Sequence, residues 1–319
     1  MPRLGAHCLR SLQKTSGKRN RVPEITEPNS LQLLEIAQHM IHARLNLLLT
    51  VVAASSIGAS STLAQQSMTH QFRAHNSRMA ELQPSLITPL VAPDPRLVQY
   101  VKFAFANQYT SMSTQTVSFG NGRGGGVIAG NRFEFDVIPP SYIEHNSKAM
   151  DGFGDSSTLA KYRIASGNAA HGNFEVTALL ARCFATGSYK NGALTDSFSP
   201  GVVFGKTVRR FDGISSLGAT LPTGKISQLG RTITWNEVIQ VHATRAVWFE
   251  LENNAAFYFA GSRDGKTQNF VTPAAFYVIR RREWKPTHPF FILDGGMQIA
   301  TSGFHTYNHN TISELRVLF

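Results

Sequence analysis

From Leu97 to the end of the chain, apolar and polar residues alternate with a period of two, and no segment shows the 3.6-residue period of a convincing amphipathic helix. In the stretch 131–138 (NRFEFDVI), aromatic and aliphatic residues share one side of an extended strand, and ionisable residues share the other. The stretches 246–253 (AVWFELEN) and 291–299 (FILDGGMQI) alternate in the same way. The pattern therefore predicts an all-β protein.

The alternating region divides into twelve strand-like segments. They are 98–107, 113–120, 126–138, 160–166, 173–185, 201–209, 213–221, 232–242, 245–259, 270–280, 289–300 and 311–319. Connectors after even-numbered segments are short, as in 121–125 (NGRGG) and 167–172 (GNAAHG), and those after segments three, five, seven, nine and eleven are longer and polar. This sorting is typical of a transmembrane antiparallel up-and-down β-barrel. We therefore expect such a barrel, of twelve strands, over residues 97–319.

The region before the alternating strands has the character of a processing signal. Residues 40–64 combine Arg44, a short apolar core and small residues, which predicts a signal peptide cleaved near Ala64. The apolar run breaks after about ten residues, whereas a membrane-spanning helix needs roughly 20. Residues 1–39 are interpreted as an upstream extension or a start-site artefact, and residues 65–96 as a periplasmic lead-in and linker. The sequence does not decide whether that linker plugs the barrel.

Composition and short motifs narrow the function classes. The formal net charge is +11, but the excess is spread along the chain without a basic run, so we expect no nucleic-acid partner. Cys8 and Cys183 are the two cysteines, too few for a disulfide framework. The glycine-rich stretch 120–126 (GNGRGGG) has dinucleotide-binding spacing but precedes a strand, which favours a hairpin turn. We expect no cofactor and no metal site.

Alternation alone does not say which face of the barrel is inside. A soluble barrel buries its apolar face, whereas an outer-membrane barrel turns that face to lipid. The export signal, the sorted connectors and the C-terminal strand favour an outer-membrane location with lipid as a partner. Ionisable residues then line the lumen, and the candidates are Arg132, Glu134, Asp136, Glu250, Glu252, Asp294, Glu314 and Arg316. The same alternation puts Glu237 on the lipid face, unless a bulge shifts the register.

The chain ends in ISELRVLF, in which Leu315, Val317 and Phe319 share the apolar side of a strand. This segment resembles the C-terminal signal of outer-membrane β-barrel proteins, whose final strand ends on Phe. The resemblance implies that the barrel-assembly machinery recognises these three residues. Val317 departs from the pattern, because an aromatic residue is more usual there.

A narrower resemblance covers about residues 200–319. The segment 217–224 (LGATLPTG) is similar to turns of the outer-membrane barrels linked to phenol-degradation (MetA-pathway) operons. The segments 247–274 and 295–319 resemble a family of uncharacterised exported barrels. The resemblance implies an outer-membrane barrel and a loose assignment to transport.

We therefore expect a channel or transporter for a small solute, apolar or aromatic solutes being candidates, and not an enzyme. The first alternative is a structural or interaction barrel plugged by its own side chains. The second is a lipid-modifying enzyme, for which Ser302 and His305 are the candidate nucleophile and base. Glu250 and Glu252 lie about 7 Å apart by strand rise, which suits paired-carboxylate hydrolysis, but an ion-paired lumen wall is the commoner use of such a pair.

Overall fold

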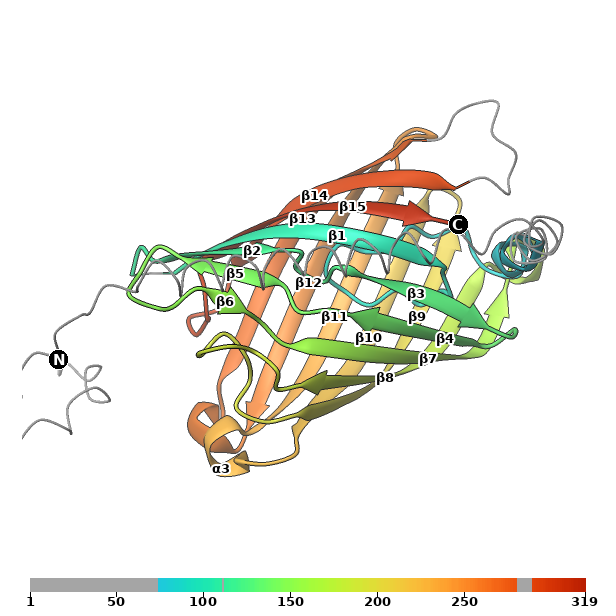
Figure 1. Cartoon of the computed structure of the whole chain (residues 1–319). Helices are drawn as coiled ribbons and strands as arrows, with labels where there is room; N and C mark the ends of the chain where they lie inside the picture. The colour runs from blue at the N-terminus through green and yellow to red at the C-terminus, as the bar shows by residue number, and fades with distance from the viewer. Residues whose placement is uncertain (1–73, 111, 280–288) are drawn as a thin grey trace, which may run out of the picture. The chain divides into compact units, whose positions relative to one another are not determined.

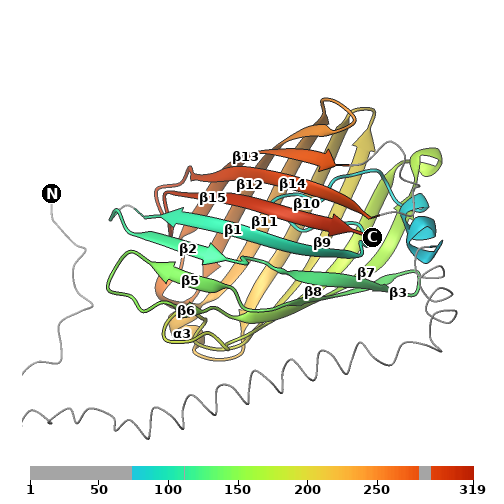
Figure 2. The same ribbon diagram turned by 45° about the horizontal axis from the view of Figure 1, so that its top comes forward.

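The computed structural model describes residues 74–110, 112–279 and 289–319, so the predicted signal peptide and its cleavage site lie outside the described residues. One antiparallel sheet closes on itself, because the last strand, β15 (His309–Leu318), pairs along its length with the first, β1 (Tyr100–Tyr109). Figures 1 and 2 show the resulting cylinder from two directions. The predicted twelve-stranded antiparallel barrel is confirmed.

Three of the twelve wall strands are interrupted, so the sheet contains fifteen segments. The interrupted strands are β2 (Gln115–Phe119) with β3 (Gly124–Ala129), β4 (Phe133–Ile138) with β5 (Tyr142–His145), and β6 (Gly152–Phe153) with β7 (Ser156–Gly167). The continuous strands between β7 and β15 are β8 (Phe174–Phe184), β9 (Ser197–Val208), β10 (Phe211–Pro222), β11 (Arg231–His242), β12 (Val247–Phe259), β13 (Thr267–Ile279) and β14 (Phe290–Ala300).

Within the described residues, helical structure is confined to short pieces. Residues 74–81 are helical, and the loops hold η1 (Ala169–His171), α3 (Ile226–Leu229) and η2 (Gly261–Arg263). Among the described residues, no helix combines the length and the apolar character needed to cross a membrane.

The glycine-rich stretch 120–126 lies inside a wall strand, which corrects the prediction of a hairpin turn. β1 pairs with β3 up to Lys102 and with β2 from Phe105 onward, so residues 120–123 stand opposite only two residues of β1. Three glycines of the stretch adopt positive φ, which costs glycine little and lets the extra residues bulge. The hairpin turn follows at 130–132.

The connectors in the described part are sorted by rim, as the sequence predicted. The long connector predicted between residues 138 and 160 is not one loop, because β5, β6 and the start of β7 lie there. The connectors at the rim where β1 begins are short: 130–132, 168–173, 209–210 and 243–246. Four of those at the opposite rim are longer than any of these: 185–196, 223–230, 260–266 and 301–308. The two rims are therefore built differently, with the longer polar connectors gathered at one end.

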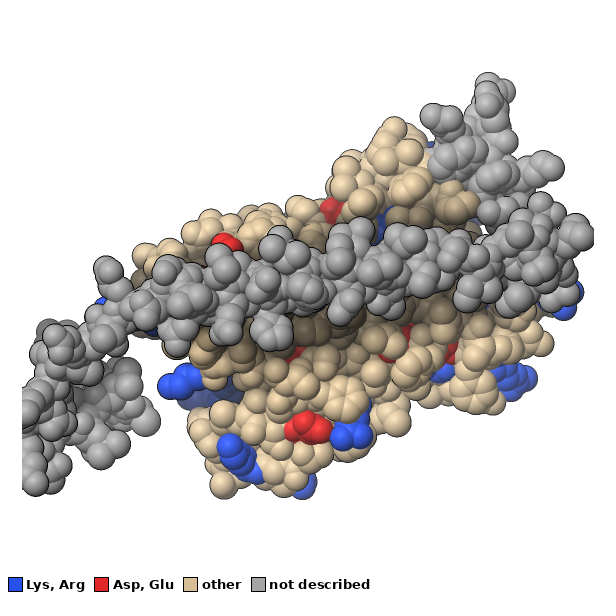
Figure 3. All heavy atoms as spheres, viewed as in Figure 1, with Lys and Arg blue, Asp and Glu red and all other residues tan. Residues whose placement is uncertain are grey.

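The strand faces are inverted relative to a soluble protein. On β4, Phe133 and Phe135 have 55% and 47% of their surface exposed, whereas Glu134 and Asp136 have 1% each. Exposed large apolar residues recur along the other long strands, and charged side chains are sparse on the described part of the face in Figure 3. Apolar groups therefore face outward and ionisable groups face inward, which is the arrangement that a lipid surround stabilises.

The carboxylate of Glu237 lies on the apolar outer face, as the alternation of the sequence predicted. β11 pairs with both neighbours without a register shift, so Glu237 shares the outer face with Trp235. Its carboxylate accepts hydrogen bonds from the Trp235 indole at 2.6 Å and from the Ser215 hydroxyl at 2.8 Å. These neighbouring donors reduce the cost of a carboxylate on an apolar surface.

Candidate functional site

The interior of the barrel is occupied by residues 83–99, which we call the plug segment. Leu86, Ile87 and Leu97 are buried to 3% exposure or less, although they precede the first strand. The sequence left open whether the lead-in and linker at 65–96 plugs the barrel, and the structure places residues 83–99 inside the wall. The plug segment packs against the wall because its aliphatic residues and prolines bury apolar surface there.

The plug segment is a closed loop braced at its base. The Gln83 side chain pairs with both backbone groups of Leu97, donating to the carbonyl at 3.0 Å and accepting from the N–H at 2.7 Å. Higher in the loop, the Arg96 guanidinium donates to Asp94 and to the Thr88 hydroxyl, each at 3.0 Å. Such a compact loop with neighbouring ends enters and leaves the barrel at the same rim.

On one side of the lumen, wall side chains hold the end of the plug segment. We call this the β4–β8 side, formed by β4, β7 and β8. Lys161 donates to the Arg96 carbonyl at 3.1 Å, and Thr177 donates to the Pro95 carbonyl. Glu134 accepts the N–H of Val98. These wall residues bind the backbone of the plug segment.

Across the lumen, the β11–β12 side holds the middle of the plug segment. Glu250 accepts the Leu90 N–H at 3.1 Å, and Glu252 accepts the N–H groups of Val91 and Ala92 at 2.8 and 2.9 Å. The Gln240 amide donates to the Ile87 carbonyl at 3.0 Å and to Glu250 at 2.6 Å. Farther round the wall, the Arg316 guanidinium donates to the Thr88 and Pro89 carbonyls at 2.6 and 2.9 Å.

Apolar contacts attach the plug segment to further strands of the wall. Ile87 and Leu90 belong to a buried cluster with wall residues of β1, β13, β14 and β15, namely Ala106, Ala274, Phe276, Ile292, Ile312 and Leu318. Leu86 and Ala92 belong to a second cluster with Val203, Ile214 and Val238. The inner wall is therefore polar with two apolar patches, and the plug segment covers both.

The predicted lumen residues fall into two groups in the structure. Seven are buried on inward strand positions: Glu134, Asp136, Glu250, Glu252, Asp294, Glu314 and Arg316. Arg132 is exposed in the turn before β4 and donates to the Tyr162 hydroxyl at 3.4 Å, because the hairpin turns at 130–132 and not earlier. The three predicted assembly-signal residues lie on β15 or just after it: Leu315 and Phe319 are exposed and Val317 is half-buried.

Most buried wall acids have a partner within the wall. Glu134 pairs with Lys161 at 2.8 Å and Glu175 with Arg163 at 2.7 Å. The other partnerships are Asp294 and Glu314 with Arg316, Asp212 with His242, and Asp136 with the Tyr100 hydroxyl. These acids are neutralised or hydrogen-bonded whether or not the plug segment is present.

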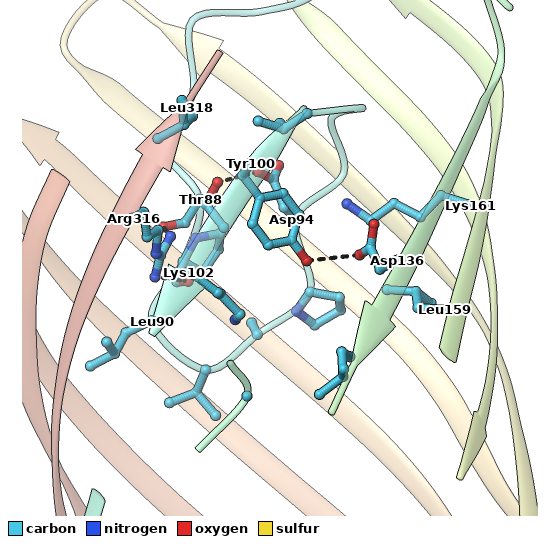
Figure 4. Close-up of a pocket in the computed structure, with 17 residues that line it drawn as sticks. Thr88, Leu90, Asp94, Tyr100, Lys102, Asp136, Leu159, Lys161, Arg316 and Leu318 are labelled. Atoms are coloured by element: carbon cyan, nitrogen blue, oxygen red, sulfur yellow. Dashed lines mark hydrogen bonds between the residues drawn. The ribbon is translucent and has the colours of Figure 1, made fainter. Parts of the chain in front are cut away.

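A cavity of about 180 Å³ remains between the plug segment and the wall. Figure 4 shows Arg316 and Lys161 on opposite sides of this space, with Tyr100 and Asp94 between them. Both charged and apolar groups line it, including Leu90 and Leu318. The plug segment therefore leaves room beside it for several water-sized molecules.

Asp94 stays ionised inside the barrel. Burial raises the pKa of its carboxyl, but the charges of Arg96 and Lys161, with hydrogen bonds from Arg96 and Thr88, lower it by more, to about 2. The ion pair between Asp94 and Arg96 fixes the turn of the plug segment at neutral pH.

The candidate nucleophile and base of a lipid enzyme do not form a pair. The Ser302 hydroxyl donates to the Phe304 carbonyl at 2.7 Å and accepts the Asn269 N–H at 2.8 Å. The His305 ring lies 2.9 Å from the Ser302 carbonyl oxygen and 3.0 Å from the Asn308 side chain. These contacts brace the loop, and they leave no hydrogen bond between the Ser302 hydroxyl and the His305 ring.

The sequence left the role of the plug segment open, although its composition carried a signal. The stretch 83–95 (QPSLITPLVAPDP) contains four prolines and four aliphatic residues other than alanine. A solvated linker has no use for so many aliphatic residues, and proline lacks the backbone N–H that would need a partner inside a barrel.

Comparison with known proteins supports the fold. No family model matches the chain, and no curated protein matches it. A crystal structure of an outer-membrane channel from Pseudomonas putida F1 superposes with a TM-score of 0.51 at 10% identity, covering 73% of this chain and all of that one. The fold is that of an outer-membrane β-barrel.

Two further barrels superpose less well. The NanC porin has a TM-score of 0.45 at 9% identity, covering 69% of this chain and 98% of its own. The translocator domain of the autotransporter NalP from Neisseria meningitidis has 0.39 at 13%, covering 82% of this chain and 98% of its own. The narrower resemblance to phenol-degradation barrels has no match among the families and stays a prediction.

Proposed function

We propose that this chain is an outer-membrane channel for a small solute and that the plug segment closes it. One observation carries the proposal: a closed barrel with an apolar outer face holds a separate loop, residues 83–99, inside its lumen. Wall groups bind that loop mainly through its backbone. Withdrawal of the loop would open a path of the restricted width that twelve strands allow, along a polar wall with two apolar patches.

The outer membrane and its assembly machinery belong to the same proposal. The exposed apolar face matches the acyl chains of a bilayer, and closure satisfies every strand's backbone without water. We assign recognition by the assembly machinery to Leu315, Val317 and Phe319. Replacing Phe319 with Ala should lower the amount of heat-modifiable barrel in the outer membrane, and unchanged assembly would contradict the assignment.

A disulfide between the plug segment and the wall, which can be formed and reduced, tests the channel proposal. A Cβ at Gly205 on β9 would lie 3.5 Å from the Cβ of Pro95, within the range of a disulfide. The Leu86 methyl group, 2.7 Å away, is the end of a flexible side chain and can move. The variant Pro95→Cys/Gly205→Cys, without Cys8 and Cys183, would tie the plug segment to the wall when oxidised.

Planar-bilayer recordings of this variant should show discrete current steps after reduction and lose most of them after oxidation. Gly205→Cys alone, in the same background, is the matched control and should respond to neither treatment. Equal currents in both redox states would show that the conducting path does not depend on the plug segment.

A structural barrel is the second candidate, and one observation favours it. The plug segment contacts strands on both sides of the lumen and so braces the cylinder from within. If the reduced variant is correctly folded and silent at all voltages, the structural function is correct and the channel proposal is not.

A further inference from the structure

Glu250 and Glu252 differ from the other buried acids of the wall. Within the described residues, neither forms an ion pair with Lys, Arg or His. Both project inward from β12 and are 5% exposed or less. Their hydrogen bonds come from neutral groups, and three of those donors are N–H groups of the plug segment.

These contacts make the two carboxylates dependent on the plug segment. Apart from the contact of the two carboxyl groups with each other, the wall supplies only the side-chain amides of Gln240 and Asn254, at 2.6 and 3.1 Å. If the plug segment withdraws, two adjacent carboxylates lose three donors while remaining inside the barrel. Uncompensated buried charge is costly, so the open lumen would attract a group that replaces those donors.

A second observation defines the chemistry of that group. The side-chain oxygen of Gln240 is buried and has no hydrogen-bond partner within the described residues, because its amide nitrogen is used by Glu250 and Ile87. Beside the two carboxylates it adds a further acceptor, and withdrawal of the plug segment would free only the one Gln240 N–H that binds Ile87. An ammonium group with three donors, or a guanidinium group with five, fits such a set of acceptors.

Apolar wall residues lie close to these acceptors. Leu90, whose N–H binds Glu250, packs in a cluster that includes Phe276 and Ile292 of the wall. Ala92, whose N–H binds Glu252, packs in the cluster that includes Val238. A ligand in this place would therefore meet carboxylates and apolar surface together.

We propose that the β11–β12 side of the lumen is the recognition site for a cationic solute that carries an ammonium or guanidinium group on an apolar body. The plug segment occupies this site in the closed state and supplies backbone N–H groups where the solute supplies its cation. The inference rests on the proposed channel function and names the class of solute.

The test compares three probes of similar size on the reduced Pro95→Cys/Gly205→Cys channel: phenylethylammonium, phenylethanol and phenylacetate. Phenylethylammonium should reduce the potassium current at concentrations where the alcohol and the anion do not. In a KCl gradient, the reversal potential should show preference for potassium over chloride. Glu250→Gln/Glu252→Gln should weaken block by the ammonium probe by roughly tenfold or more and reduce the cation preference.

Glu144→Gln is the matched control, because Glu144 is exposed on β5, and it should leave the block by the ammonium probe unchanged. Equal block by the alcohol, or undiminished block in the double Gln variant, would overturn the solute assignment. Heat-modifiable migration on a gel verifies that each variant folds.

Calorimetric titration of the full chain in detergent separates this inference from the channel proposal. Phenylethylammonium binding that is lost in Glu250→Gln/Glu252→Gln would support the site even if bilayers stay silent. In that case the channel proposal fails alone. No binding and no block would overturn the site while currents still support a channel.

Discussion

The two sides of the lumen hold the same plug segment by different means. On the β4–β8 side, Glu134 and Glu175 have their own cations, Lys161 and Arg163, so this wall is electrostatically complete without the loop. On the β11–β12 side, two carboxylates rely on the loop for donors. The difference indicates that the first side stabilises the barrel and the second side responds to occupancy of the lumen.

The largest expected effect on stability comes from a substitution on the β4–β8 side. Glu175→Ala should lower the free energy of unfolding by about 3–5 kcal/mol, because it leaves the buried Arg163 guanidinium without its carboxylate. Urea unfolding in detergent micelles measures this. Glu175→Leu/Arg163→Met removes both charges and should recover most of the loss. A small effect of the single substitution would mean that the ion pair does not support this wall.

Leu90→Ala should weaken docking of the plug segment by about 2–5 kcal/mol, because it empties part of a buried apolar cluster. The barrel itself should keep its unfolding midpoint. Trypsin cleavage after Arg96 reports release of the loop and should accelerate. Val91→Ala is the matched control, since the Val91 side chain is exposed, and equal acceleration there would contradict the docking account.

Glu252→Gln should weaken docking by about 1.5–3 kcal/mol, because two hydrogen bonds to a charged acceptor become bonds to a neutral one. The same cleavage assay measures the change. Removing a carboxylate should therefore release the loop on this side without destabilising the wall. If Glu252→Gln lowers the urea midpoint of barrel unfolding instead, the β11–β12 side also stabilises the barrel and the two sides do not differ in this way.

The pH dependence of the plug segment sharpens the comparison further. The pKa of Asp94 is lowered from its ordinary value of 3.8 to about 2. The ion pair of Asp94 therefore stabilises the loop by about 2 kcal/mol above pH 3.8, and this stabilisation is lost as the pH falls through 2. Bilayer recordings should show more frequent opening between pH 4 and pH 2. Asp94→Asn should open more often at neutral pH and change less on acidification. An equal increase in opening on acidification in both proteins would show that Asp94 does not control release of the plug segment.

The wall of the barrel could be predicted from local pattern, and the plug segment could not. Period-two alternation predicted that Phe135 and Glu134 lie on opposite faces, and connector length predicted which connectors share a rim. Both features depend on residues that are neighbours in the sequence. The glycine-rich stretch 120–126 was assigned to a turn, since glycines suit bulges and turns equally.

The plug segment has no period, and its position depends on wall groups about 160 residues away, such as Glu252. For the same reason, sequence alone brought Glu250 and Glu252 together on one strand but gave no indication of their partners. Arg132 was misplaced with them because the turn came later than the alternation suggested.

Hydrogen exchange of the full chain in lipid bilayers tests the central claim most directly. The backbone N–H groups of Val91 and Ala92 should exchange as slowly as those of β12, and far more slowly than those of the connector 185–196. In Glu250→Gln/Glu252→Gln, exchange at Val91 and Ala92 should accelerate while β12 is unchanged. Wild-type exchange at these two residues as fast as in the connector would contradict a plug held inside the barrel.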